Sequence, residues 1–381
     1  MQLSDEEQSI QRLAREFATN EIEPVAVELE REGQFPWSIV EKAAEADLLA
    51  PTLPVEYGGA GLGLVPELLI QEEFHRVDPG IAESVLAATF GCDVIVSNGS
   101  ETQIEEYVRP ATHGELITGV GMTEPESGSD FASIQTAAER ENDEYVINGE
   151  KVFISNGSIA DAIVLFARTS SPEKPHRGIT GFVIDTERDG FEQTPMEGYL
   201  GPDTVDLGQL YLDDVRVPVE ARLGEEGEGF YQAMEFMDES RVSVAAASVG
   251  VAQGALDHTI EYVTDREQFG QSVSEYQAVR HRLADLATRI EATRAFVYSV
   301  ARDIEADRLA DRSARPAMAK LLATELAEEV ASEAIQLHGG YGVFDEYRVE
   351  SFFRATKGPQ IYEGTSEIMR EVISESLFDR T

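Results

Sequence analysis

The sequence predicts an α+β protein of several domains, in which a middle β domain (a barrel or sandwich) lies between two helical domains. Three observations indicate this class. The chain has 381 residues, enough for two or three domains of about 150 residues, and 42% of them are hydrophobic, enough for sizeable cores. Apolar residues recur with helical spacing at both ends and form short strand-like runs between them. The expected domains are an N-terminal helical domain over residues 1–116, a β domain over 117–225 and a C-terminal helical bundle over 226–381.

The N-terminal domain opens on a helix start signal. Ser4, followed three residues later by Glu7, matches a capping box. A glycine-rich stretch over residues 57–63 interrupts the helical pattern, and its glycines lack the spacing of a dinucleotide-binding fingerprint. We therefore expect this stretch to be a loop that links two helices.

The middle domain shows the period of β-strands. Residues 163–166 form a short apolar run, and Val215, Val217 and Val219 alternate with polar residues. Turn clusters such as residues 188–190 separate these runs. The pattern predicts about 110 residues of strands and turns.

Helices return in the C-terminal domain. Val279, Leu283, Leu286 and Ile290 recur at steps of three and four residues, which places them on one face of a helix. The stretch over residues 244–252 is rich in small side chains, which permit close approach between helices. A packed helical domain is expected here.

The charge balance is extreme. The chain carries 30 basic and 72 acidic residues, a formal net charge of −42, and only five lysines. Such a surface repels phosphate backbones, so neither nucleic acid nor an anionic membrane is an expected partner. Concentrated salt would screen the self-repulsion, so the sequence favours a salt-loving source. No EF-hand loop is present, which argues against an acidic calcium-binding protein.

The compartment follows from what the sequence lacks. The first residues, MQLSDEEQ, have neither the basic nor the apolar region of a signal peptide, and no apolar run reaches about 18 residues. The lone Cys92 has no partner for an internal disulfide, and the six histidines show no metal-ligand spacing. A cytoplasmic protein without a metal site is expected.

Five segments carry residues suited to binding or catalysis. Glycines and hydroxyls let a backbone approach a phosphorylated ligand, an arginine suits a diphosphate, and a carboxylate among apolar residues suits general-base chemistry. Taken singly, each segment is more typical of an ordinary structural feature: a turn, a core aromatic residue, a surface ion pair, a helix end or one carboxylate among many. The segments are residues 123–130, 151–157, 265–270 with Gln277, 336–342 and 360–368.

Taken together and in this order, seven segments resemble the acyl-CoA dehydrogenase family over essentially the whole chain. Each segment is weakly informative alone, and their common register makes the resemblance strong. The segments are Pro54–Gly59, Met122–Asp130, Phe153–Gly157, Asp214–Pro218, Arg266–Gly270, Gln336–Gly340 and Ile361–Ile368.

The resemblance implies a C-terminal four-helix bundle, an FAD between the β domain and the bundle, and a homotetramer in which a neighbouring subunit completes each flavin site. It places Met122, Thr123 and Ser129 along the flavin, with Ser129 also facing CoA. Phe153 stands where the family usually has tryptophan. Ser155 stands where a threonine hydroxyl commonly bonds flavin N5.

The resemblance also implies contacts from the bundle. Thr365 and Glu367 match further FAD contacts, although Glu367 replaces a frequent glutamine and would repel the phosphates if it pointed at them. Asp238 and Arg241 match positions that meet CoA. Tyr362 and Gly364 flank the substrate. The matches to contacts made by the neighbouring subunit are Arg266, Phe269, Gln277, Gln336, Gly339 and Gly340.

The implied chemistry is the α,β-dehydrogenation of an acyl-CoA. Glu363 removes the α-proton, the β-hydrogen leaves as hydride to flavin N5, and the electrons pass to an electron-transfer flavoprotein. Because a thioester α-proton is far less acidic than a carboxylic acid, hydrogen bonds from the Glu363 amide and a flavin ribityl hydroxyl must stabilise the enolate. Closing the site raises the basicity of the carboxylate through desolvation. The product is a trans-2-enoyl-CoA.

Variants within the family narrow this expectation. Some relatives carry the base at the position of Ser240, and Glu239 lies about 100° away around the helix, so Glu363 keeps the role. Nitroalkane-oxidising relatives have aspartate in place of Glu363. Glutaryl-type relatives use an arginine that residues 80–91 lack, which favours a plain acyl chain. The alternatives are an oxidase that uses oxygen and a non-catalytic CoA-binding relative.

Overall fold

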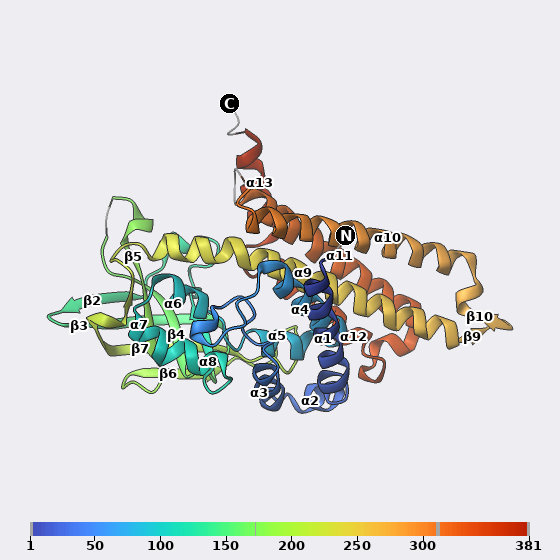
Figure 1. Cartoon of the computed structure of the whole chain (residues 1–381), viewed down its shortest axis with the longest axis horizontal. Helices are drawn as coiled ribbons and strands as arrows, with labels where there is room; N and C mark the ends of the chain where they lie inside the picture. The colour runs from blue at the N-terminus through green and yellow to red at the C-terminus, as the bar shows by residue number, and fades with distance from the viewer. Residues whose placement is uncertain (1–2, 172, 310–312, 379–381) are drawn as a thin grey trace.

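The computed structural model describes residues 3–171, 173–309 and 313–378 (Figure 1). The outer ends of the first and third predicted domains therefore lie outside the described residues. The β domain occupies one end of the molecule, and long helices run away from it to the far end. The first N-terminal helices lie against the middle of these long helices, and the later ones lie beside the β domain (Figure 1).

The N-terminal domain is helical, as expected. The capping box is confirmed, since the Glu7 amide donates to Ser4 Oγ at 3.2 Å and the Ser4 amide donates to Glu7 Oε2 at 2.7 Å. Asp78 caps a later helix by accepting from the Ile81 amide at 2.8 Å. The helices are α1 (Asp5–Phe17), α2 (Ala26–Glu32), α3 (Trp37–Glu45), α4 (Leu64–Val77), α5 (Pro79–Leu86), α6 (Cys92–Asn98), α7 (Glu101–Gln103) and α8 (Arg109–Thr112).

The middle domain is an eight-stranded sheet. Its main path runs β6-β7-β3-β2-β4-β5-β8, and β1 pairs with β4 in parallel. The long pair β3–β7 is antiparallel and changes register between Lys151 and Ile154, which marks a β-bulge. The strands are β1 (Thr118–Gly121), β2 (Ala137–Glu141), β3 (Glu144–Ser155), β4 (Ala162–Arg168), β5 (Ile179–Asp185), β6 (Phe191–Pro195), β7 (Leu207–Pro218) and β8 (Arg222–Leu223).

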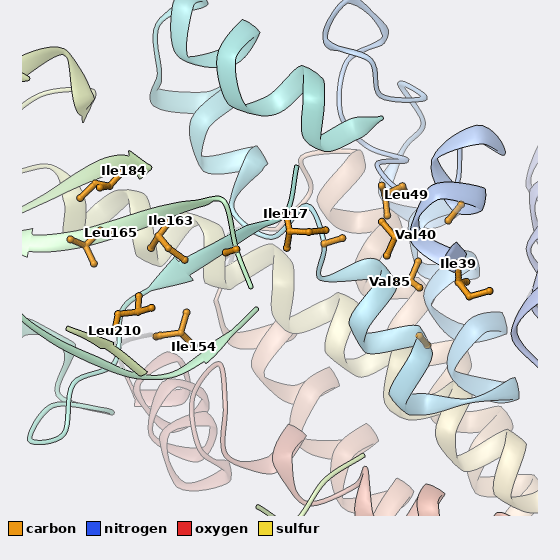
Figure 2. Packing of buried hydrophobic residues seen from close by; sticks show 14 of the residues in the cluster. Ile39, Val40, Leu49, Val85, Ile117, Ile154, Ile163, Leu165, Ile184 and Leu210 are labelled. Atoms are coloured by element: carbon orange, nitrogen blue, oxygen red, sulfur yellow. The ribbon is translucent and has the colours of Figure 1, made fainter. Parts of the chain in front are cut away.

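One hydrophobic core joins the N-terminal helices to the sheet. Figure 2 shows Ile39 and Val40 of α3 and Val85 of α5 continuing through Ile117 into the strand residues Ile154, Ile163, Leu165, Ile184 and Leu210. Burying such side chains contributes roughly 1.5–3 kcal/mol each relative to exposure. The first two domains are therefore packed together through an apolar interior.

The C-terminal domain is built on α9, a helix of 37 residues. Its small residues allow the close approach expected from the sequence, because a Cβ at Gly250 or Gly254 would meet backbone oxygens of α4 at 2.4 Å or 2.2 Å. Within the described ranges, no helix is both long and apolar enough to cross a membrane. The elements are α9 (Gly229–Asp265), β9 (Glu267–Gln268), β10 (Gln271–Ser272), α10 (Gln277–Glu305), α11 (Ala314–His338), α12 (Val349–Arg354) and α13 (Ser366–Phe378).

Candidate functional site

Glu363 lies in a turn between α12 and α13 whose backbone is left-handed. Its φ is 52°, and the next residue, Gly364, has φ of 96°. A side chain in the left-handed region costs roughly 1–2 kcal/mol, so the surroundings must hold it there. Thr365 Oγ1 then accepts from the Ile368 amide at 3.2 Å and caps α13, which fixes the end of the turn.

Two buried cations hold the turn by its carbonyl groups. The ammonium of Lys320, on α11, donates to the Tyr362 oxygen at 2.9 Å and to the Gly364 oxygen at 2.6 Å. The Nε of Arg241, on α9, donates to the Glu363 oxygen at 3.4 Å. Three consecutive carbonyls therefore face positive charge.

The carboxyl group of Glu363 is buried, and its pKa is raised. Its Oε2 is buried and has no hydrogen-bond partner among the described residues. Burial raises its pKa to about 7; a hydrogen bond from Ser240 and the charges of Lys320 and Arg241 oppose the shift, and the charge of Glu83 adds to it. A carboxyl with this pKa is close to half ionised at neutral pH, which suits proton transfer.

The α9 residues near Glu363 point in different directions. Ser240 faces Glu363, whereas the charge of Glu239 acts on the buried carboxyl groups of Glu67 and Asp93. Adjacent helical residues differ by about 100° in direction, which accounts for the separation. Of these two carboxylates, Glu239 points away from the turn and Glu363 lies in it.

Arg241 and Asp238, expected to meet CoA, form an ion pair on α9. Arg241 Nη1 lies 2.6 Å from Asp238 Oδ1, and the arginine side chain is 7% exposed. Ser313 Oγ also donates to Asp238 Oδ2 at 2.8 Å. The Arg241 guanidinium is thus held between Asp238 and the Glu363 turn.

In the β domain, a buried ion pair fixes the loop after β1. Lys151 Nζ lies 2.8 Å from Glu124 Oε1 and donates to the Met122 oxygen at 3.0 Å. Glu124 also accepts from the Thr136 amide at 2.9 Å, and the Val152 amide donates to the Thr123 oxygen at 2.9 Å. The backbone at residues 122–124 is therefore held against β3.

The β3 bulge turns an aromatic ring outward. Phe153 has φ of 59°, and its side chain is 63% exposed although both chain neighbours are buried. Ser155 lies two residues further along the same strand and is partly exposed, and Ser129 is exposed on the loop after β1. An exposed ring beside hydroxyls fits stacking against a planar ligand.

A second group of predicted residues meets at the far tip of the bundle. A hollow of about 540 Å³ is lined by Arg266, Gln336, Gly339 and Gly340. A Cβ added at either glycine would meet nothing within 4 Å, and Arg266 forms no ion pair with the described residues. The Arg266 guanidinium lies over the Tyr341 ring, 5.6 Å from its centre. A guanidinium without an ion-pair partner, an amide and open backbone fit a diphosphate.

The tip and the Glu363 turn are far apart in one chain. Arg266 follows Arg241 by 25 residues along α9, which at 1.5 Å per residue is roughly 37 Å. Figure 1 shows the β9–β10 hairpin at the end of the molecule opposite to the β domain. Phe269, at the tip of that hairpin, is 97% exposed, and Gln277 is exposed at the start of α10. The residues expected at one FAD are therefore split between two distant surfaces.

Both surfaces fit the FAD that the sequence implies, since one offers an exposed ring with hydroxyls and the other a cation with open glycines. Glu367 is exposed in the first turn of α13. The sequence reading missed Lys320 and the Lys151–Glu124 pair. The signal was present, because two of only five lysines stand within apolar segments of an arginine-rich chain.

Comparison with protein families identifies all three domains. Residues 4–115 match the acyl-CoA dehydrogenase N-terminal domain, residues 119–215 the middle domain and residues 227–378 the C-terminal domain. The chain is 36% identical to the caffeyl-CoA reductase–Etf complex subunit CarC of Acetobacterium woodii, with 100% of both chains covered. It is 37% identical to the short-chain specific acyl-CoA dehydrogenase of Clostridium acetobutylicum, with 99% of each covered.

Solved structures agree in fold. The butyryl-CoA dehydrogenase of Megasphaera elsdenii superposes with a TM-score of 0.93 at 34% identity, covering 99% of each chain. A glutaryl-CoA dehydrogenase from Mycobacterium smegmatis in complex with FADH2 gives a TM-score of 0.93 at 27% identity, covering 99% of this chain and 96% of that one.

Proposed function

Since the chain belongs to the acyl-CoA dehydrogenase family, we propose that it converts an acyl-CoA thioester to a trans-2-enoyl-CoA with Glu363 as the base. It is an FAD-dependent oxidoreductase that acts on an acyl-CoA. The observation that carries the proposal is the buried, unpartnered Oε2 of Glu363, whose carboxyl pKa burial raises to about 7.

The chain's own residues handle the α-proton. The Cα–H bond breaks, Glu363 takes the proton, and the electron pair moves into the forming double bond. The Glu363 amide donates to the thioester carbonyl and so stabilises the enolate as charge develops. Lys320 and Arg241 bind the carbonyls of the same turn and keep the carboxylate aimed. FAD, when bound, supplies the acceptor for the hydride from the β-carbon.

We assign the β-domain surface and the bundle tip to one FAD site that two subunits share. Met122, Thr123, Ser129, Phe153 and Ser155 would meet the flavin from one subunit. The residues at the bundle tip would meet the diphosphate and adenosine of a neighbour's FAD, because roughly 37 Å along α9 separates Arg266 from Arg241, which contacts the Glu363 turn. This geometry supports at least a dimer as the active form, and the homotetramer is the assembly that the family resemblance implies.

Two relatives that are reductases favour a second candidate function, the reduction of an enoyl-CoA. The Acetobacterium woodii protein is a caffeyl-CoA reductase subunit in an Etf complex, and a protein from Clostridium sporogenes, 35% identical over 99% of this chain, is a 3-(aryl)acrylate reductase. The reverse reaction uses the same site, with protonated Glu363 giving its proton to the α-carbon. An electron-transfer flavoprotein is the proposed redox partner in either direction.

Anaerobic mixing with a panel of acyl-CoAs tests the proposal. Bleaching of the bound flavin absorbance by at least one acyl-CoA is expected, with an enoyl-CoA product. Reoxidation of the bleached enzyme by a 2-enoyl-CoA would favour the reductase direction, and peroxide release under air would favour the oxidase. No bleaching by any acyl-CoA would contradict the proposal and favour a non-catalytic CoA-binding protein.

A further inference from the structure

We propose that Lys320 is a positioning residue for the base: its ammonium clamps the two carbonyls that flank Glu363 and so sets the direction of the carboxylate. The inference rests on the proposed function of Glu363. It concerns a residue on α11, 43 positions before the base in the sequence.

The burial of Lys320 needs an explanation. Its side chain is 0% exposed, on a helix whose neighbouring buried residues include Ala317, Ala319 and Ala323. An ammonium taken out of water is costly unless it is hydrogen-bonded or paired. Packing alone would be served by an apolar side chain of the same length. The two hydrogen bonds to the Glu363 turn are what this position gains from a lysine.

The two bonds act on the carbonyl groups of the residues before and after Glu363. One fixes the Tyr362 carbonyl at 2.9 Å and the other the Gly364 carbonyl at 2.6 Å. Since φ of Glu363 is 52°, a conformation that a side chain rarely adopts, the turn needs such a support to persist. The Tyr362 carbonyl belongs to the peptide group before Glu363, the Glu363 carbonyl that Arg241 binds belongs to the one after it, and the Gly364 carbonyl belongs to the next. Lys320 thus holds the turn on both sides of the Arg241 contact, which fixes the direction of the Cα–Cβ bond of Glu363 and therefore the position of its carboxylate.

The compact ammonium also suits the place. A lysine is a point charge with three donors that rotate to meet two carbonyls, whereas the planar guanidinium of arginine has fixed directions. Most basic residues of this chain are arginines, as at position 241 on the other side of the turn. At position 320, a lysine meets two carbonyls that converge on one donor atom.

The charge of Lys320 has a second, measurable effect. Three charged side chains face the Glu363 carboxyl from packed helices: Glu83 of α5 raises its pKa, and Lys320 of α11 and Arg241 of α9 lower it. The neighbouring Tyr362 on the same turn is neutral, because burial holds the pKa of its hydroxyl well above 10. Removing the Lys320 charge therefore shifts the pKa of Glu363 upward.

The test compares Lys320→Met with Lys174→Met, a control at an exposed lysine in the β domain. For Lys320→Met we expect kcat to fall roughly 10- to 100-fold with KM for acyl-CoA little changed, because the base is displaced while binding persists. The acid limb of the pH–rate profile moves to higher pH. The control behaves as the unmodified enzyme in both measurements.

Hydrogen exchange of the FAD-loaded protein gives a readout that does not depend on activity. Amides of residues 362–366 should exchange about tenfold faster in Lys320→Met, with no change in the β domain. If Lys320→Met does not fold, Lys320→Gln, which keeps a donor but not the charge, should show the shifted acid limb. Unchanged exchange, kcat and pH profile would overturn the inference. An inactive unmodified enzyme would refute the proposed function. Hydrogen exchange would still show whether Lys320 holds the Glu363 turn in place.

Discussion

The Glu363 turn and the bundle tip both combine glycine with a cation, but they use them in opposite ways. At the turn, Lys320 and Arg241 are buried and already bound to carbonyl groups of their own chain. At the tip, Arg266 is exposed beside Gly339 and Gly340, with open space in front of both glycines. The cations of the first region are satisfied within one chain, whereas the second region stays open, as our proposal of a site shared between two subunits requires.

The largest effect is expected from a substitution in the Glu363 turn. Glu363→Gln should lower turnover by about 10²- to 10⁴-fold, because an amide cannot accept the α-proton. FAD content and thermal stability should persist, since burial already favours a neutral group at this position. Stopped-flow bleaching measures the loss, and Glu375→Gln on the exposed face of α13 is the control. Undiminished bleaching would assign the base elsewhere.

A smaller effect is expected from a substitution at the bundle tip. Arg266→Gln should weaken FAD binding by roughly 10- to 100-fold, the range for one charge-assisted hydrogen bond. Turnover should recover at saturating FAD, because the base is untouched. Titration of the apoprotein with FAD measures the affinity, with Arg12→Gln on α1 as an exposed control.

Mixing the two variants sharpens the contrast. In a dimer with one Glu363→Gln and one Arg266→Gln subunit, one of the two shared sites has both intact residues. Co-expression should therefore restore part of the activity at low FAD. If each FAD were bound within a single chain, mixing would restore nothing, and the shared site would be ruled out.

The pH profile probes the turn without a mutation. The rate constant kcat/KM should rise about tenfold per pH unit below the Glu363 pKa of about 7 and level off above it, because the carboxylate form is the base. In the reductase direction the sign is reversed, since the protonated form is needed. A limb centred near the ordinary carboxyl value of 4.5 would show that burial does not act on Glu363 as described.

The smallest expected effect is that of salt on the melting temperature, which depends on the net charge of the whole chain and not on either region. With a net charge of −42, self-repulsion at low salt should be relieved as the Debye length shrinks from about 10 Å at 0.1 M to about 3 Å at 1 M. The melting temperature of the FAD-saturated protein is expected to rise by several degrees over that range of KCl. A flat dependence would argue against a salt-adapted protein.

Local patterns predicted the domain order, the Ser4 capping box and the start of the last helix near Thr365, because each depends on neighbours in sequence. The choice of Glu363 came only through the family resemblance. Among 72 acidic residues, spacing does not reveal which carboxyl is buried, since burial is made by distant helices such as α9 and α11.

Pairs of residues far apart in the sequence could not be predicted either, because their contacts form only when distant elements pack together. Lys320 and the Tyr362 carbonyl are 42 residues apart, and Lys151 and Glu124 are 27 apart. The outward direction of Phe153 follows from a bulge in the β3–β7 register, which depends on a strand more than 50 residues away. Such features exist only once the elements are packed.

The two buried lysines also make the native protein unusually resistant to amine-directed labelling. Lys42 and Lys357 have side chains 48% exposed and Lys174 is exposed, whereas Lys151 and Lys320 are sealed. Acylating reagents should thus modify three of the five ε-amines while the chain is folded, and the remaining two only after it opens. Mass spectrometry could then follow loosening of the β-domain loop and of the Glu363 turn independently, one peptide for each.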